Sequence, residues 1–264
     1  MTRIQTAFAR RNGRPALIAY ITAGDPDADT TLALMHTLAA NGADIIELGV
    51  PFSDPMADGP VIQRATERAL AQGMTLSGVL ELVRRFRRDN TDTPVVLMGY
   101  LNPVHAMGYE NFAAAAAEAG VDGALTVDCP IEVAEPLQNA LQKHGLDSVF
   151  LVTPTTGEAR MRQIAARASG FAYYVSLKGV TGSAALDTAQ VAEKMAVLRK
   201  HFTIPIGVGF GIADAEDAKR IGAVADAVIV GSRIVREIEQ QRGRENEAVA
   251  ELVRGLKQAL DGAD

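Results

Sequence analysis

The sequence predicts an α/β fold: a (β/α)8 TIM barrel with an extra N-terminal helix, in which residues 1–264 form a single catalytic domain. Eight apolar segments are each followed by a helical pattern. The unit repeats at a spacing of roughly 25–30 residues, which is the pattern of a barrel of ~250 residues. A doubly wound sheet would carry G-x-G-x-x-G after its first strand, whereas this chain has Ala23-Gly24-Asp25-Pro26 there.

Each predicted strand is a short apolar run that ends at turn-forming residues. The strands are residues 16–22, 43–49, 94–100, 122–127, 146–152, 171–176, 204–208 and 226–230. Each predicted helix has apolar residues at helical spacing, and the units restart after a glycine. The helices are residues 2–11, 31–41, 61–72 and 76–90, an alanine-rich helix that ends at Gly120, two that end near residues 144 and 168, then 188–200, 214–222 and further helices to about residue 260.

Composition narrows the classes of partner. The net charge of -6 comes from 32 acidic and 26 basic residues. Apart from the short cluster Arg84-Arg85-Phe86-Arg87-Arg88 the basic residues are scattered, which disfavours a nucleic-acid partner. No apolar run is long enough to span a membrane, and a single cysteine, Cys129, fits a reducing compartment. We therefore expect a cytoplasmic protein without a membrane partner.

A metal site is not expected either. The four histidines are far apart in the sequence, and no motif gives the spacing of a metal site.

Glu47 is the first candidate for catalysis. Period-2 alternation places Glu47 near the C-terminal end of an apolar strand, on one face with Ile45 and Gly49. Burial disfavours the charged form of a carboxylate, so its pKa should rise toward the value that a general acid/base needs near neutral pH. The structural alternative is a glutamate held by a backbone amide or an arginine.

Asp58 is the second candidate, because it lies on the loop that follows the strand of Glu47. An aspartate before Gly59-Pro60 is also a common way to begin a helix, and that alternative stays open. In its favour, two carboxylates on one strand and its loop would give a pocket two separated proton-transfer groups.

Three tyrosines, Tyr20, Tyr100 and Tyr173, lie at or near strand ends, where they would line the pocket of an aromatic substrate or pack in the core.

Two glycine turns predict a phosphate site. Gly209-Phe210-Gly211 follows the seventh strand and Gly231-Ser232 follows the eighth, where barrels commonly bind phosphate through backbone N–H groups. Gly182, after the sixth strand, would close the third side. Lys178 is the competitor for the chemistry, since a lysine can form a Schiff base with a carbonyl substrate if its pKa is lowered.

The motifs together resemble one family. The stretch from Glu47 to Gln63, E-L-G-V-P-F-S-D-P-M-A-D-G-P-V-I-Q, is similar to the signature of the tryptophan synthase alpha chain. The shorter motifs Gly24-Asp25-Pro26, Gly179-Val180-Thr181-Gly182, Gly209-Phe210-Gly211-Ile212 and Gly231-Ser232 match that family in order and spacing. The resemblance covers essentially the whole chain.

The resemblance implies a lyase of tryptophan biosynthesis that cleaves indole-3-glycerol phosphate to indole and glyceraldehyde 3-phosphate by a retro-aldol reaction. It implies that Glu47 is the general acid/base and that Asp58 interacts with the indole N–H. It further implies phosphate contacts from Gly182, Phe210, Gly211, Gly231 and Ser232, and substrate contacts from Tyr173, Tyr100 and Thr181.

The resemblance also implies a partner, a beta chain that carries pyridoxal phosphate and consumes the indole in an alpha2-beta2 heterotetramer. No cofactor is expected on this chain. The small residues of 177–186 suggest a lid that closes when the partner binds. A flavin-binding barrel oxidoreductase and a non-catalytic activator barrel are the alternatives from other classes.

Overall fold

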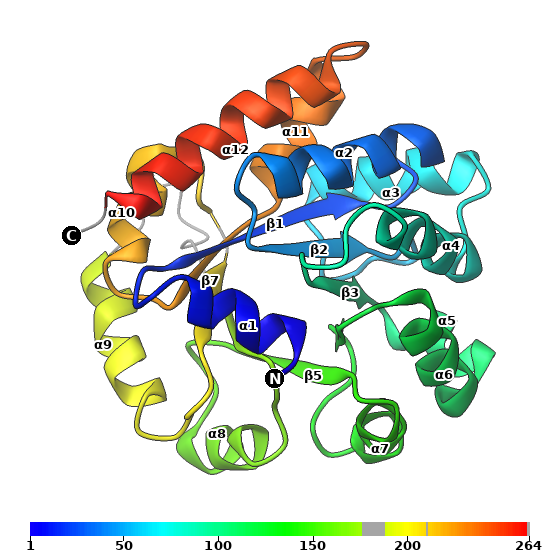
Figure 1. The fold of residues 1–264 in the computed structure, drawn as a ribbon. Coiled ribbons are helices and arrows are strands. Elements are labelled where there is room, and N and C mark those ends of the chain that lie inside the picture. Colours follow the sequence, from blue (N-terminus) through cyan, green and yellow to red (C-terminus); the bar gives the residue numbers. More distant parts are fainter. Residues whose placement is uncertain (176–187, 210, 263–264) are drawn as a thin grey trace.

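A closed barrel of parallel strands, β1 to β8 in chain order, forms the centre of the molecule. The computed structural model describes residues 1–175, 188–209 and 211–262, and Figure 1 shows the helices arranged around the barrel. The strands are β1 (Ala16–Thr22), β2 (Ile45–Gly49), β3 (Val95–Gly99), β4 (Gly123–Thr126), β5 (Asp147–Val152), β6 (Ala172–Val175), β7 (Ile206–Gly209) and β8 (Ala227–Val230). The predicted (β/α)8 architecture is confirmed.

The helices include the predicted extra one before the first strand. They are α1 (Arg3–Arg10), α2 (Ala28–Ala40), α3 (Pro60–Ala71), α4 (Leu76–Arg87), α5 (Leu101–Met107), α6 (Tyr109–Ala119), α7 (Glu135–Lys143), α8 (Glu158–Ala165), α9 (Thr188–Leu198), α10 (Ala215–Gly222), α11 (Ser232–Gln240) and α12 (Glu245–Asp261). The stretch expected as one alanine-rich helix is two, α5 and α6. Gly108, with φ of 86°, separates them in a conformation that only glycine adopts readily.

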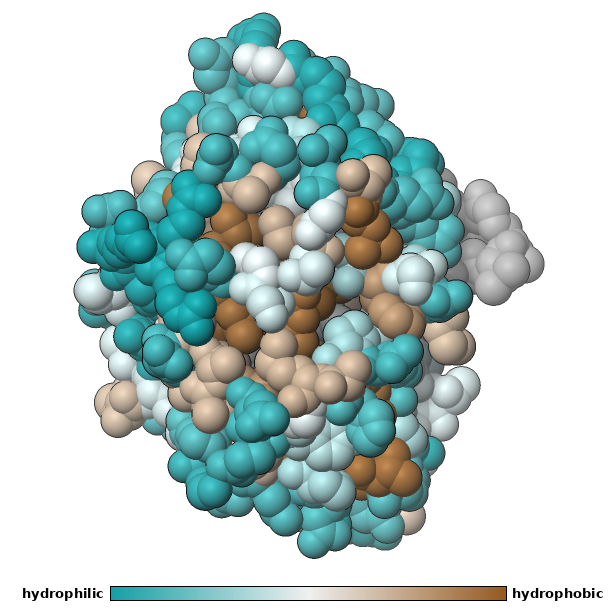
Figure 2. Space-filling model, turned by 90° about the vertical axis from the view of Figure 1, so that its right-hand side faces the viewer, coloured by the Kyte–Doolittle hydropathy of each residue, from teal (hydrophilic) through white to brown (hydrophobic). Residues whose placement is uncertain are grey.

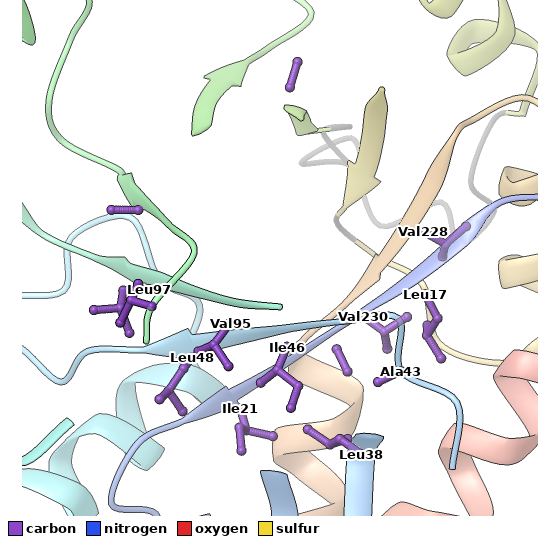
Figure 3. Close-up of a cluster of buried hydrophobic side chains, with 14 of the residues drawn as sticks. Leu17, Ile21, Leu38, Ala43, Ile46, Leu48, Val95, Leu97, Val228 and Val230 are labelled. Carbon is purple, nitrogen blue, oxygen red and sulfur yellow. The ribbon is translucent and has the colours of Figure 1, made fainter. Parts of the chain in front are cut away.

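The strands alternate between two apolar layers. Outward side chains such as Ile46 and Leu48 pack with the surrounding helices, and Figure 3 shows both in one cluster with Leu38 of α2. Inward side chains such as Ile45 and Val96 fill the barrel itself. This is the period-2 alternation of a strand that is buried on both faces. It places Glu47, two residues after Ile45, inside the barrel.

Helix α1 closes the N-terminal end of the barrel. Ile4 and Ala7 belong to the same cluster as Ala16 and Phe171, which lie where β1 and β6 begin, and α1 lies across the barrel in Figure 1. Thr2 caps the helix and also donates to Asp147 at the start of β5, at 3.2 Å. The side chains of α1 thus fill this end, which leaves the opposite, C-terminal end of the barrel for a candidate site.

Three aspartates tie neighbouring βα units together. Each directly precedes a strand and accepts a hydrogen bond from a backbone N–H near the start of the strand before it. The bonds are Leu17 N to Asp44 at 2.8 Å, Val95 N to Asp122 at 2.8 Å and Ile206 N to Asp226 at 2.9 Å. Each carboxylate is also ion-paired, Asp44 with Lys257, Asp122 with Arg87 and Arg3, and Asp226 with Arg199. The three bonds to backbone N–H groups, which are buried or part-buried, fix the spacing of the strands.

Replacement of Asp122 by alanine should cost about 3–5 kcal/mol of unfolding free energy, because it leaves the largely buried Arg87 without this counter-ion and the Val95 N–H without its side-chain acceptor. The Asp122 side chain is 5% exposed and that of Arg87 10%. Asp92→Ala is the matched control, since its ion pair with Arg10 is exposed on both sides and should contribute less than about 1 kcal/mol. Urea unfolding of both variants measures the difference; equal losses would contradict the role given to Asp122.

Candidate functional site

Glu47 is buried inside the barrel on β2. It lies opposite Tyr20 of β1 and Val96 of β3 in the strand register, and it is 1% exposed. Its Oε1 atom has no hydrogen-bond partner in the described part of the chain. Burial, and then the nearby charge of Asp58, raise its pKa to about 8. The expected rise is therefore present, and neither an arginine nor a backbone amide holds Oε1 as the structural alternative requires.

Asp58 is half-buried on the loop between β2 and α3. The Tyr100 hydroxyl donates to Asp58 Oδ2 at 3.0 Å and accepts from the Ala57 N–H at 3.0 Å. Burial raises the pKa of Asp58, and the bond from Tyr100 opposes that rise. The helix does begin here, as the structural alternative expects, with Gly59 as its N-cap and Pro60 as its first residue, but no described side chain caps it. Tyr100 thus fixes the loop that carries the second carboxylate.

Two more tyrosines point into the barrel, and each lies against a glycine. A Cβ atom at Gly49 would lie 2.2 Å from the Tyr20 hydroxyl, and one at Gly209 would lie 2.4 Å from the Tyr173 hydroxyl. Only glycine leaves room for the rings at these strand ends. Burial, and then the charge of Glu47, raise the pKa of Tyr173. The tyrosines and both carboxylates therefore share one end of the barrel.

The glycine turns after β7 and β8 lie at the same end. Gly231 is the N-cap of α11, and no described side chain caps that helix, so its first N–H groups can bind an anion. Ser232 is the first residue of the helix, and Gly211 adopts φ of 80°. Arg233 is ion-paired with Glu237. A phosphate here would be held mainly by backbone N–H groups and a hydroxyl.

Some predicted residues fall on parts of the chain that the structure leaves undescribed. Thr181, Gly182 and Phe210 lie outside the described residues, as do Lys178 and the predicted lid at 177–186. Their roles stay predictions.

The face that Figure 2 turns to the viewer is the side toward which β1 and β2 point in Figure 1. Brown, apolar surface shows in its middle, and teal, hydrophilic residues surround it.

Among residues 1–175, 188–209 and 211–262, no group of His, Cys, Asp and Glu is placed to hold a metal ion. None of the helices in those ranges is long and apolar enough to cross a membrane.

Sequence reasoning missed one buried carboxylate near the site. Asp25, to which the sequence assigned no role beyond its place in the Gly24-Asp25-Pro26 motif, is 2% exposed and makes two bonds of 2.8 Å with Arg68 of α3. Glu239 of α11 joins Arg68 to Arg64. The network links the β1–α2 turn to α3 and α11. Four-residue spacing of the two arginines on one helix was a signal for a shared acceptor, but nothing local in the sequence identifies that acceptor.

Comparison with known proteins decides the family. A family model described as "Tryptophan synthase alpha chain" matches residues 7–261. The chain belongs to the tryptophan synthase alpha chain family. A relative of that name from Neisseria meningitidis serogroup B is 64% identical over 260 residues, which cover 98% of this chain and 100% of the relative. The predicted family is confirmed, in place of a flavin oxidoreductase or a non-catalytic barrel.

Solved structures of tryptophan synthase agree with the fold. Tryptophan synthase subunit alpha from Legionella pneumophila str. Paris is 44% identical, with a TM-score of 0.93 and 99% of both chains covered. A chain from the α2β2 complex of tryptophan synthase from Pyrococcus furiosus is 36% identical, with a TM-score of 0.86, 92% of this chain and 98% of that chain covered. The tryptophan synthase alpha fold thus extends over nearly all of this chain.

Glu47→Gln should stabilise this family member at neutral and alkaline pH. The folded state raises the pKa of Glu47 from 4.5 to about 8, so folding favours the protonated form and native stability falls as pH rises from about 4.5 to 8. Glutamine keeps the shape without the charge. The variant should gain on the order of 3 kcal/mol at pH 7 and little below pH 4.5.

Urea unfolding between pH 4 and 9 measures this gain. Glu118→Gln is the control, because Glu118 is exposed on α6 and its replacement should change stability by less than about 0.5 kcal/mol at every pH. A gain for Glu47→Gln that did not grow with pH would show that burial does not hold the proton on Glu47.

Proposed function

We propose that this chain is a lyase that cleaves indole-3-glycerol phosphate into indole and glyceraldehyde 3-phosphate, by a retro-aldol reaction. The observation that carries the proposal is Glu47: a buried carboxyl group with one unpaired oxygen and a pKa of about 8, beside a second carboxylate, in a member of this family. A group with that pKa is protonated at neutral pH and can act first as an acid and then as a base.

In the first step, Glu47 gives its proton to the ring carbon of indole that carries the side chain. The ring then holds a positive charge centred on its nitrogen. Asp58 takes the place beside the indole N–H, where its negative charge stabilises the protonated ring. The bond from Tyr100 to Asp58 favours the ionised form of this carboxylate. Burial raises the pKa of Asp58 and the bond from Tyr100 opposes that rise; the proposed mechanism needs Asp58 ionised and Glu47 protonated when the substrate binds.

In the second step, the ionised Glu47 takes the proton of the side-chain hydroxyl next to the bond that breaks. The oxygen electrons form the aldehyde carbonyl, and the electrons of the broken C–C bond return to the ring and restore the neutral indole. One proton has been given and one taken, so Glu47 ends as it began. The reaction needs no cofactor on this chain, because the protonated ring itself accepts the electrons.

The two ends of the substrate bind to different parts of the C-terminal opening of the barrel. The phosphate binds the N–H groups at Gly211, Gly231 and Ser232, completed by Gly182 and Phe210. The indole ring lies near Tyr173, Tyr100 and Thr181. What supports the phosphate position is the uncapped start of α11 at Gly231.

The enzyme works with a tryptophan synthase beta chain, in a complex of the same kind as the tryptophan synthase α2β2 complex from Pyrococcus furiosus. We place pyridoxal phosphate on the beta chain only, and we place the complex, an alpha2-beta2 heterotetramer, in the cytoplasm. Residues 1–264 act in it as one catalytic domain, which supplies indole for tryptophan synthesis.

The decisive experiment is to measure the release of indole from indole-3-glycerol phosphate by the purified chain, with and without a beta chain. Glu47→Gln and Asp58→Asn should each lower kcat by roughly 10²–10⁴-fold, which is the usual size of a proton-transfer contribution. Asp54→Asn is the control on the same loop, since Asp54 is exposed and its side chain accepts from Ser53. Near-normal turnover by Glu47→Gln would refute the mechanism.

Tyr100→Phe tests the support of Asp58. Loss of the hydroxyl bond should raise the pKa of Asp58, so the acid side of the pH profile of kcat should move to higher pH. A bond to a charged group contributes about 1.5–3 kcal/mol, so kcat should fall roughly tenfold or more.

Tyr109→Phe is the control for Tyr100→Phe. The Tyr109 hydroxyl is hydrogen-bonded to His105 on the neighbouring helix rather than to Asp58. An unshifted acid limb in Tyr100→Phe would mean that Tyr100 does not set the ionisation of Asp58.

A further inference from the structure

Tyr20 is a buried polar residue near the C-terminal opening of the barrel. The proposed reaction gives it no role. It lies on β1 with its side chain inside the barrel, opposite Glu47 in the register, and it is 5% exposed. Burial, followed by the charge of Asp58, raises its pKa, so the hydroxyl stays protonated. A large side chain beside Glu47 either only packs there or also contributes to the reaction.

The ring of Tyr20 spans two parts of the site. On one side is Gly49, the next inward position after Glu47 on β2, where an added Cβ would lie 2.2 Å from the Tyr20 hydroxyl. On the other side is Gly231, at the start of α11, where an added Cβ would lie 3.4 Å from the Tyr20 Cβ. The ring therefore fills the space between the strand of the proton-transfer group and the turn proposed for phosphate.

Tyr20 also contacts the helices that follow both parts of the site. Its own small cluster contains Ala65 of α3 and Val235 of α11, both fully buried. Helix α3 begins two residues after Asp58, and α11 begins at Ser232. One ring thus packs against the two helices whose first turns follow the Asp58 loop and the phosphate turn.

The orientation of the ring is fixed at its far end. The Tyr20 hydroxyl lies 3.3 Å from Thr22 Oγ1, and Thr22 is 1% exposed. This contact and the close approach to Gly49 hold the ring against β2. A rigid spacer is what a site needs when atoms at opposite ends of a substrate must be held together, since a displacement of about 1 Å can cost 10²-fold in rate.

We propose that Tyr20 is a positioning residue that sets the distance between Glu47 and the phosphate turn at Gly231. With the phosphate bound at α11, the ring of Tyr20 holds β2, α3 and α11 at the spacing that brings the reacting ring carbon to the Glu47 carboxyl group. The ring, rather than the hydroxyl, is the main spacer, and Thr22 orients it. This inference rests on the proposed function of the site.

The experiment compares kcat and KM of three variants on indole-3-glycerol phosphate. Tyr20→Leu removes most of the spacer and should lower kcat by roughly tenfold to hundredfold, with a smaller change in KM. Tyr20→Phe keeps the ring and should retain kcat within about threefold. Tyr174→Leu is the matched control: Tyr174 is a buried tyrosine on the outward layer of β6, so its loss should lower stability and leave kcat of the folded protein unchanged.

A double-mutant cycle with Gly49 tests the contact itself. Gly49→Ala should displace the ring and lower kcat, and the combination with Tyr20→Leu should be no worse than Tyr20→Leu alone, because the displaced ring is then absent. Urea unfolding of each variant confirms that folded protein is compared. If Tyr20→Leu does not fold, Tyr20→Met, which fills more of the space, replaces it in the cycle.

The outcomes separate this inference from the proposed function. A wild-type chain that releases no indole, alone or with a beta chain, would remove the proposed function and the inference with it. An active wild type with kcat of Tyr20→Leu within twofold of normal would overturn the inference alone. So would a Tyr174→Leu variant that loses as much kcat as Tyr20→Leu, or a Gly49→Ala effect that adds in full to that of Tyr20→Leu.

Discussion

The site depends on a carboxyl group that is buried in the barrel with an oxygen left unpaired. An unpaired charge at that depth is strongly unfavourable, so the fold keeps Glu47 protonated at neutral pH, and its pKa of about 8 is the direct consequence. A residue in this state reduces the stability of the domain whenever it ionises. The barrel tolerates it because other contacts, formed elsewhere, hold the strands in place.

Those contacts lie at the end of the barrel away from the chemistry. Helix α1 fills the N-terminal opening, and Asp44, Asp122 and Asp226 each bind a backbone N–H of the preceding strand. At the C-terminal end, β2 and β7 finish in Gly49 and Gly209, against which the rings of Tyr20 and Tyr173 pack. The contacts that stabilise the barrel and the proposed chemistry are thus separated along the barrel axis, as expected of this architecture. Substitutions at the N-terminal end should therefore reduce folding stability, and substitutions at the C-terminal end should reduce turnover.

Local pattern was enough to predict the strands, the burial of Glu47 and the turns at Gly211 and Gly231, because each depends on period, face or turn chemistry within a few residues. It was not enough for contacts between distant residues. The bond from Tyr100 to Asp58 joins residues 42 apart, and that from Arg68 to Asp25 joins residues 43 apart. Such pairs follow from strand register and loop packing, which no short window of sequence contains.

The environments of the two carboxylates explain how one barrel can both give and take a proton. Burial raises the pKa of Asp58 and the hydrogen bond from Tyr100 opposes that rise, while the charge of Asp58 in its ionised form adds to the burial that holds a proton on Glu47. In the proposed reaction, the positive charge that forms on the substrate ring offsets the charge of Asp58, so the pKa of Glu47 falls as its proton leaves. When the C–C bond breaks, the ring becomes neutral, and its positive charge no longer offsets the effect of the Asp58 charge on Glu47. The pKa of Glu47 then rises again, which favours uptake of the hydroxyl proton, so the same pair of charges assists both steps.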